Sequence, residues 1–120
     1  MANPFVHIEL NTTDVGAAKS FYSSLFGWKL EDMQMGPDTY TFIDVGEGTG
    51  GGILKHPMPG EPSIWIPYVL VDDLEASTQQ AQALGATVIK GVTEVPNMGW
   101  FSIISDPTGG TLGLWKTKAQ

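Results

Sequence analysis

Residues 5–10 read Phe-Val-His-Ile-Glu-Leu. Apolar and polar side chains alternate along this run, which is the period of a β-strand with one buried face. We expect the apolar face, formed by Val6, Ile8 and Leu10, to pack under a helix. His7 and Glu9 then lie on the opposite face of the strand, where they are the first two functional candidates.

The residues after this strand predict an amphipathic helix. Residues 11–14, Asn-Thr-Thr-Asp, offer side-chain oxygens for an N-cap, and Gly27 is placed to end the helix. Across the predicted helix Asp14–Phe26, apolar side chains recur at helical spacing: Val15, Ala18, Phe21, Tyr22 and Leu25. Strands are then expected at residues 28–34, 39–45 and 51–55.

The same order of elements occurs again after a Pro-rich segment, residues 56–63. A β-branched and aromatic run at 64–71 precedes a helix expected over Leu74–Leu84, and strands expected at 86–92, 100–105 and 111–116 follow. A repeat of this kind indicates tandem supersecondary units. We predict an α+β fold in one domain, residues 1–120. Two βαβββ modules, 1–55 and 64–118, joined by the linker 56–63, form a curved eight-stranded sheet around a cleft.

Composition excludes several classes of function. Six basic residues, all lysine, face thirteen acidic ones, and the net charge is -7. Nucleic-acid binding needs a basic surface, and tight phosphate or carboxylate recognition usually uses arginine, so neither is expected. Without cysteine, disulfides and thiolate chemistry are excluded. No signal peptide and no membrane-spanning run is visible, so a cytoplasmic protein without a membrane partner is predicted.

Several segments resemble the vicinal oxygen chelate superfamily, which includes glyoxalase I, bleomycin-resistance proteins and extradiol dioxygenases. They are the strand 5–10 with Asp14, Phe-Tyr-Ser-Ser-Leu-Phe-Gly-Trp at 21–28, Gly-Gly-Ile at 51–53, Tyr-Val-Leu-Val-Asp-Asp-Leu at 68–74, and Asp-Pro-Thr-Gly-Gly-Thr-Leu-Gly-Leu-Trp at 106–115. The resemblance implies paired βαβββ modules around a shared cleft. It also implies a homodimer, which would cover open sheet edges.

The resemblance gives four positions at which enzymes of the superfamily hold a divalent ion. The first-strand position falls on His7, but its counterpart in the second module is Ile66. The last-strand positions fall on Gly113 and near Gly52–Ile53. Catalytic sites typically use three or more protein ligands, and Glu9 could add one. We therefore expect no bound metal and no other cofactor.

The cleft is predicted to carry one acidic group among aromatic walls. Glu9 is interpreted as a general base or a ligand anchor, or alternatively as the partner of a lysine or a solvated carboxylate. By the offset between the modules Tyr68 corresponds to Glu9, and Trp100 follows a loop that could act as a lid. Core or dimer contacts are the alternatives for the aromatic residues. The predicted ligand-binding residues are His7, Glu9, Ile66, Tyr68, Trp100, Gly113 and Trp115.

These observations predict a glyoxalase- or bleomycin-resistance-like protein that binds a small molecule in its inter-module cleft without a catalytic metal. The alternative is a metal-dependent lyase or dioxygenase with a non-standard site around His7 and Glu9. A third possibility is a cleft that serves as an assembly surface. Because Glu9 has no arginine to neutralise it, the cleft is predicted to prefer neutral or cationic, partly aromatic molecules.

Overall fold

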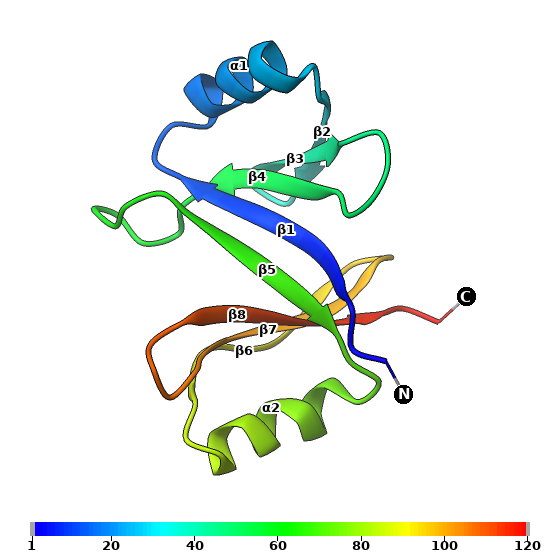
Figure 1. Cartoon of the computed structure of the whole chain (residues 1–120), viewed down its shortest axis with the longest axis vertical. Helices are drawn as coiled ribbons and strands as arrows, with labels where there is room; N and C mark the ends of the chain where they lie inside the picture. The colour runs from blue at the N-terminus through cyan, green and yellow to red at the C-terminus, as the bar shows by residue number, and fades with distance from the viewer. Residues whose placement is uncertain (1, 120) are drawn as a thin grey trace. The chain divides into compact units, whose positions relative to one another are not determined.

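A computed structural model describes residues 2–119. The chain forms two compact units, His7–Ile66 and a second one composed of Met1–Val6 with Pro67–Gln120. Each unit contains one helix and the greater part of four strands, and Figure 1 shows each helix beside the strands of its own unit. The predicted α+β class with two βαβββ modules is confirmed. The cleft shared by the modules stays a prediction.

The first module follows the predicted order of elements. Its strands are ordered β2-β3-β4-β1, with β1 and β4 parallel and the other pairs antiparallel. Its elements are β1 (Phe5–Thr12), α1 (Val15–Phe26), β2 (Lys29–Met35), β3 (Asp38–Asp44) and β4 (Gly51–Lys55). All five predicted elements of this module are therefore present, within a few residues of the expected bounds.

The second module repeats this arrangement. Its strands are ordered β5-β8-β7-β6, again with one parallel pair, β5 with β8, and two antiparallel pairs. Its elements are β5 (Ile64–Leu70), α2 (Leu74–Ala83), β6 (Thr87–Val95), β7 (Gly99–Ser105) and β8 (Thr111–Thr117). The pairing of β6 with β7 is interrupted by two register shifts.

The two helices begin with the same N-cap. Oδ1 of Asp14 accepts a hydrogen bond from Ala17 N at 3.0 Å, and Oδ1 of Asp73 accepts one from Ala76 N at 3.0 Å. Each bond satisfies one of the N–H groups that a helix leaves unpaired at its first turn. The helix α1 ends at Gly27, whose φ of 70° is the left-handed conformation of a glycine C-cap.

Each module has its own apolar core between helix and sheet. The first core is built on Leu10, Ile43 and Ile53, and the second on Val71, Leu74, Ile104 and Leu114. Val15, Ala18 and Tyr22 of α1 pack against the first core as their spacing predicts. Phe21 and Leu25 do not, because each is 57% exposed, and Ile8 of β1 is 36% exposed. The apolar side chains of α1 therefore cover a wider surface of the helix than the part that contacts the first core.

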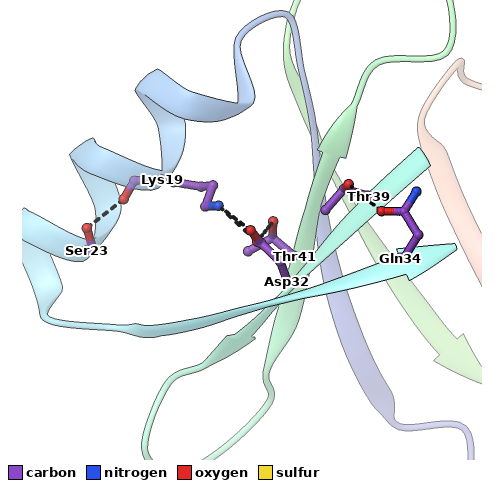
Figure 2. A network of polar contacts seen from close by, with 6 residues as sticks. All are labelled: Lys19, Ser23, Asp32, Gln34, Thr39 and Thr41. Atoms are coloured by element: carbon purple, nitrogen blue, oxygen red, sulfur yellow. Dashed lines mark hydrogen bonds and ion pairs between the residues drawn. The ribbon is translucent and has the colours of Figure 1, made fainter. Parts of the chain in front are cut away.

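One polar network joins α1 to the sheet of the first module (Figure 2). Lys19 Nζ lies 2.9 Å from Oδ1 of Asp32 on β2, and the hydroxyl of Thr41 on β3 donates to the same oxygen at 2.7 Å. These donors lower the pKa of the Asp32 carboxyl. The lysine, which is the single charged residue of α1, is thus held against the sheet.

Within residues 2–119, no helix has the length and apolar character needed to cross a membrane.

Candidate functional site

Three side chains of the first module form a continuous hydrogen-bonded chain. Nε2 of His7 lies 2.6 Å from the hydroxyl oxygen of Tyr40, and this hydroxyl donates to Oε1 of Glu9 at 3.0 Å. Because the phenol proton is directed at Glu9, the His7 ring supplies the proton between Nε2 and Tyr40. The alternation of β1 places His7 and Glu9 on one face, as the sequence predicts.

Asn11, two residues farther along β1, completes what we call the polar cluster: His7, Glu9, Asn11 and Tyr40. Its Nδ2 donates to Oε2 of Glu9 at 3.2 Å, so each carboxyl oxygen accepts a hydrogen bond. Two donors facing two oxygens suit a carboxylate, which can only accept. Glu9 is 9% exposed, and Asn11 and Tyr40 are also buried. The solvated position considered for Glu9 is therefore not found.

Gly52 provides the space in which the Tyr40 ring lies. It pairs with Glu9 on β1 and with Phe42 on β3, so it is in the middle of the sheet. A Cβ atom built on Gly52 would overlap the Tyr40 phenol. The glycine near the expected last-strand metal position is therefore covered by an aromatic hydroxyl that bonds both His7 and Glu9.

Burial lowers the pKa of the His7 imidazole below its usual value near 6.5. The cause is loss of hydration, which penalises the charged ring more than the neutral one. Burial therefore favours the uncharged form of the ring.

The lowered pKa of His7 predicts a loss of stability in acid. As the pH falls below about 6.5, the unfolded chain binds a proton at this residue that the folded chain resists, so the free energy of unfolding decreases. Urea unfolding between pH 7.5 and 5.5 should show this decrease, and His7→Gln should remove part of the slope. An identical slope in the variant would show that His7 is not the group responsible.

Module two shows a related arrangement around Tyr68. Tyr68 is buried and pairs with Gly113 on β8, and a Cβ on Gly113 would overlap the Tyr68 ring. The ring of Phe101 meets it edge-on, with centroids 6.3 Å apart. In both modules, then, a tyrosine covers a glycine of the last strand, although in module two the tyrosine comes from the first strand.

The remaining predicted site residues are placed differently. Ile66 is buried and shares a face of β5 with Tyr68. Trp115 pairs with Phe101, and its Nε1 donates to the Thr117 hydroxyl at 3.0 Å. Trp100 packs against the core on the α2 side, so the structure does not bring it to the face of Tyr68.

The loop before Trp100 is short. Met98 N donates to Val95 O at 3.0 Å, and Met98 O accepts from Lys118 N at 2.9 Å. Asn97 has a φ of 68° at the centre of this turn. The loop expected to act as a lid is thus a hairpin turn bonded on both sides.

The side chains present do not fit a metal centre of the superfamily type. Between residues 2 and 119 there is no group of three or more His, Cys, Asp or Glu side chains able to hold an ion. The tyrosine rings over Gly52 and Gly113 occupy the volume that a ligand side chain at either glycine would need. Nε2 of His7 already forms a hydrogen bond with the Tyr40 hydroxyl.

Tyr40 and Asn11 are the members of the polar cluster that sequence reasoning missed. Asn11 continues the alternation of His7 and Glu9 by one more step, so the strand period alone could have found it. Tyr40 had no such signal. Its place beside Glu9 depends on the pairing of β3 with β4 and of β4 with β1.

The family model of the Glyoxalase/Bleomycin resistance protein/Dioxygenase superfamily matches residues 5–114. The chain belongs to this superfamily. The match includes both modules and every predicted site residue except Trp115, and it confirms the family suggested by the sequence motifs.

Curated relatives match most of this chain. A protein of Mycobacterium bovis named "Putative glyoxylase CFP32" is 36% identical over 116 residues, which are 91% of this chain and 44% of the relative. The anthracycline biosynthesis protein DnrV of Streptomyces peucetius is 26% identical over 123 residues, covering 90% and 45%. The chain thus spans less than half the length of these relatives.

Solved structures show the same fold at low sequence identity. A "hypothetical protein" from Bacillus halodurans has a TM-score of 0.76 at 18% identity, covering all of this chain and 98% of that one. Methylmalonyl-CoA epimerase from Mycobacterium tuberculosis has a TM-score of 0.71 at 14% identity, covering 96% and 88%. At these identities the likeness supports the fold and not the activity.

Proposed function

We propose that this superfamily member binds a small organic molecule beside the polar cluster, in the cleft expected of paired βαβββ modules, without a divalent metal. The observation that carries the proposal is the buried chain from His7 through Tyr40 to Glu9. Apolar side chains of similar volume often stabilise a protein as well as a buried, hydrogen-bonded polar group does. Three polar residues on one face of β1, joined by Tyr40 of β3 and mostly buried, are better explained by recognition than by stability.

The surroundings expected of the ligand also support this proposal. Small-molecule sites are mostly apolar and aromatic, with a few polar groups that fix orientation. The polar cluster supplies such groups, and Ile66, Tyr68, Gly113 and Trp115 are the proposed walls. Trp100, which packs on the α2 side, is not part of the proposed site.

The proposed ligand is neutral or cationic and partly aromatic. Glu9 is buried and the chain has no arginine that could bind an anionic group. A hydrogen bond from a charged ligand to a carboxylate contributes about 1.5–3 kcal/mol. Aromatic side chains would add about 0.5–2 kcal/mol through stacking or contact with a cation.

Glu9→Gln should therefore weaken a cationic ligand about ten- to a hundredfold. A thermal-shift screen of a library of mixed charge would find ligands, and calorimetry would compare the variants. Glu31→Gln is the matched control, because it makes the same change at an exposed position of β2. Hits that are predominantly carboxylates or phosphates, with affinities unchanged in Glu9→Gln, would contradict the proposal.

A second candidate function is acid–base catalysis without a metal, and the direction of the hydrogen bonds favours it. A proton taken from a substrate by Nδ1 of His7 could be balanced by transfer of the Nε2 proton to Tyr40 and of the phenol proton to Glu9. Each group then exchanges one proton, the Glu9 carboxyl becomes neutral, and the negative charge moves to the substrate.

The metal-dependent lyase or dioxygenase remains the rival of both functions. Elemental analysis of protein purified without chelators decides against it if clearly less than one equivalent of metal is found. One equivalent of zinc, nickel, iron or manganese, lost on His7→Ala, would favour the rival and contradict the metal-free proposals.

We further propose that residues 1–120 act as one domain in the cytoplasm, with modules 1–55 and 64–118, and that the domain forms a homodimer. The strands β2 and β6, at the ends of the sheet order, leave backbone groups that a partner or charged side chains must protect. Closed two-fold pairing is the commonest form of self-association in proteins.

A further inference from the structure

We propose that the outer face of α1 is the surface through which two copies of this chain associate. The inference deepens the proposed homodimer and is independent of the ligand site. It rests on an apolar face that the first module does not use: Phe21, Leu25 and Phe26 are each 57% exposed, and α1 has no buried residue. An exposed apolar patch rimmed by polar residues commonly marks an interaction site.

The exposed side chains of α1 continue into a set of packed aromatic rings. The centroid of Tyr22 lies 4.9 Å from that of Phe21, 5.6 Å from Trp28 and 5.4 Å from Trp65. Phe26 and Trp28 are 4.8 Å apart. This α1 patch comprises Phe21, Tyr22, Leu25, Phe26, Trp28 and Trp65. Because its rings brace one another, it is a preformed surface, and little side-chain entropy is lost when a partner binds.

The second module provides an internal comparison. Counted from the N-caps Asp14 and Asp73, the positions of Phe21 and Tyr22 correspond to Gln80 and Ala81 in α2. The helix α2 exposes Leu84 at its C-cap, but its outer surface otherwise carries glutamines and Glu75. The fold therefore does not require an aromatic outer face on this helix, and only α1 has one.

The charge of α1 suits a second copy as the occupant. Two chains that each carry -7 repel one another, so a stable pair needs a contact surface without acidic groups. Residues 15–26 contain no acidic residue, and their one charge, Lys19, is paired with Asp32 inside the module. A basic partner would instead be drawn to the acidic surface elsewhere on the chain.

The α1 patch also includes a hollow that can receive its own projecting side chains. Trp28 and Trp65 line it together with Ile8 and Val45, all four within the unit His7–Ile66, and its volume is about 120 Å³. Ligand pockets usually measure about 300–1,000 Å³, so this hollow suits a single side chain better than a ligand. In a two-fold pair, Phe21 or Leu25 of each copy can fill the hollow of the other.

The test is sedimentation velocity across a concentration series for the wild type, Phe21→Glu and Leu25→Glu. The wild type should sediment as a dimer at 10 µM, about twice the chain mass. Since each substitution enters a two-fold interface twice, each should raise the dimer dissociation constant about a hundredfold. Both residues are exposed, so the melting temperature measured on the monomer should hardly change.

Leu84→Glu is the matched control, because Leu84 follows its N-cap Asp73 at the same distance as Leu25 follows Asp14 and is also exposed, at 71%, but lies at the end of α2. A control that stays dimeric while both α1 variants dissociate supports the proposal. Dimers that survive both α1 substitutions, or that dissociate in Leu84→Glu alone, overturn the α1 interface and leave the homodimer standing. A wild type that is monomeric at 100 µM overturns both.

Discussion

Replacing Gly52 by alanine should destabilise the protein by about 2–6 kcal/mol. The added Cβ would overlap the Tyr40 phenol, and overpacking of this kind costs about 1–3 kcal/mol. Displacing the phenol would also weaken its hydrogen bonds to His7 and Glu9, at a further cost of about 1–3 kcal/mol. Thermal unfolding should show a decrease of about 10 °C or more in the melting temperature.

Gly91→Ala separates this effect from the general effect of removing a strand glycine. A Cβ at Gly91 meets no atom within 4 Å, so the control should change stability by less than about 0.5 kcal/mol. If Gly52→Ala were as stable as this control, the Tyr40 ring could not lie over Gly52 as described.

Tyr40→Phe should cost about 1.5–3 kcal/mol although the ring is retained. The variant removes the donor to Glu9 Oε1 and the partner of His7 Nε2, and a hydrogen bond to a charged group contributes about that amount. Chemical denaturation at pH 7 gives the free energy of unfolding. The same variant should weaken any ligand found by the thermal-shift screen, because the polar cluster is no longer fixed in one geometry.

Tyr22→Phe is the control for loss of a phenol. The Tyr22 ring packs in the aromatic set of α1, and within residues 2–119 no hydrogen bond to its hydroxyl is found. Its removal should change stability by less than about 0.5 kcal/mol. Equal costs for the two variants would mean that the Tyr40 hydroxyl makes no special contribution.

The elements of the fold were predictable because their signals are local. The alternation along residues 5–10, the aspartates before each helix and the glycine after α1 all act over a few residues. The repetition of these signals in the second half indicated two modules, and the structure confirms them. Placing His7 and Glu9 on one face needed only the two-residue period of a strand.

The polar cluster and the α1 patch were decided by tertiary structure. Tyr40 is 31 residues from Glu9, and their contact depends on how β3 and β4 pair with β1, a register that no local pattern specifies. Helical spacing marked Phe21 and Leu25 as apolar but could not say whether the core would reach them. The sequence by itself thus determined which residues are apolar, polar or turn-forming and the order of the elements. Strand register and the limited area of one sheet face decided which of those side chains meet and which stay exposed.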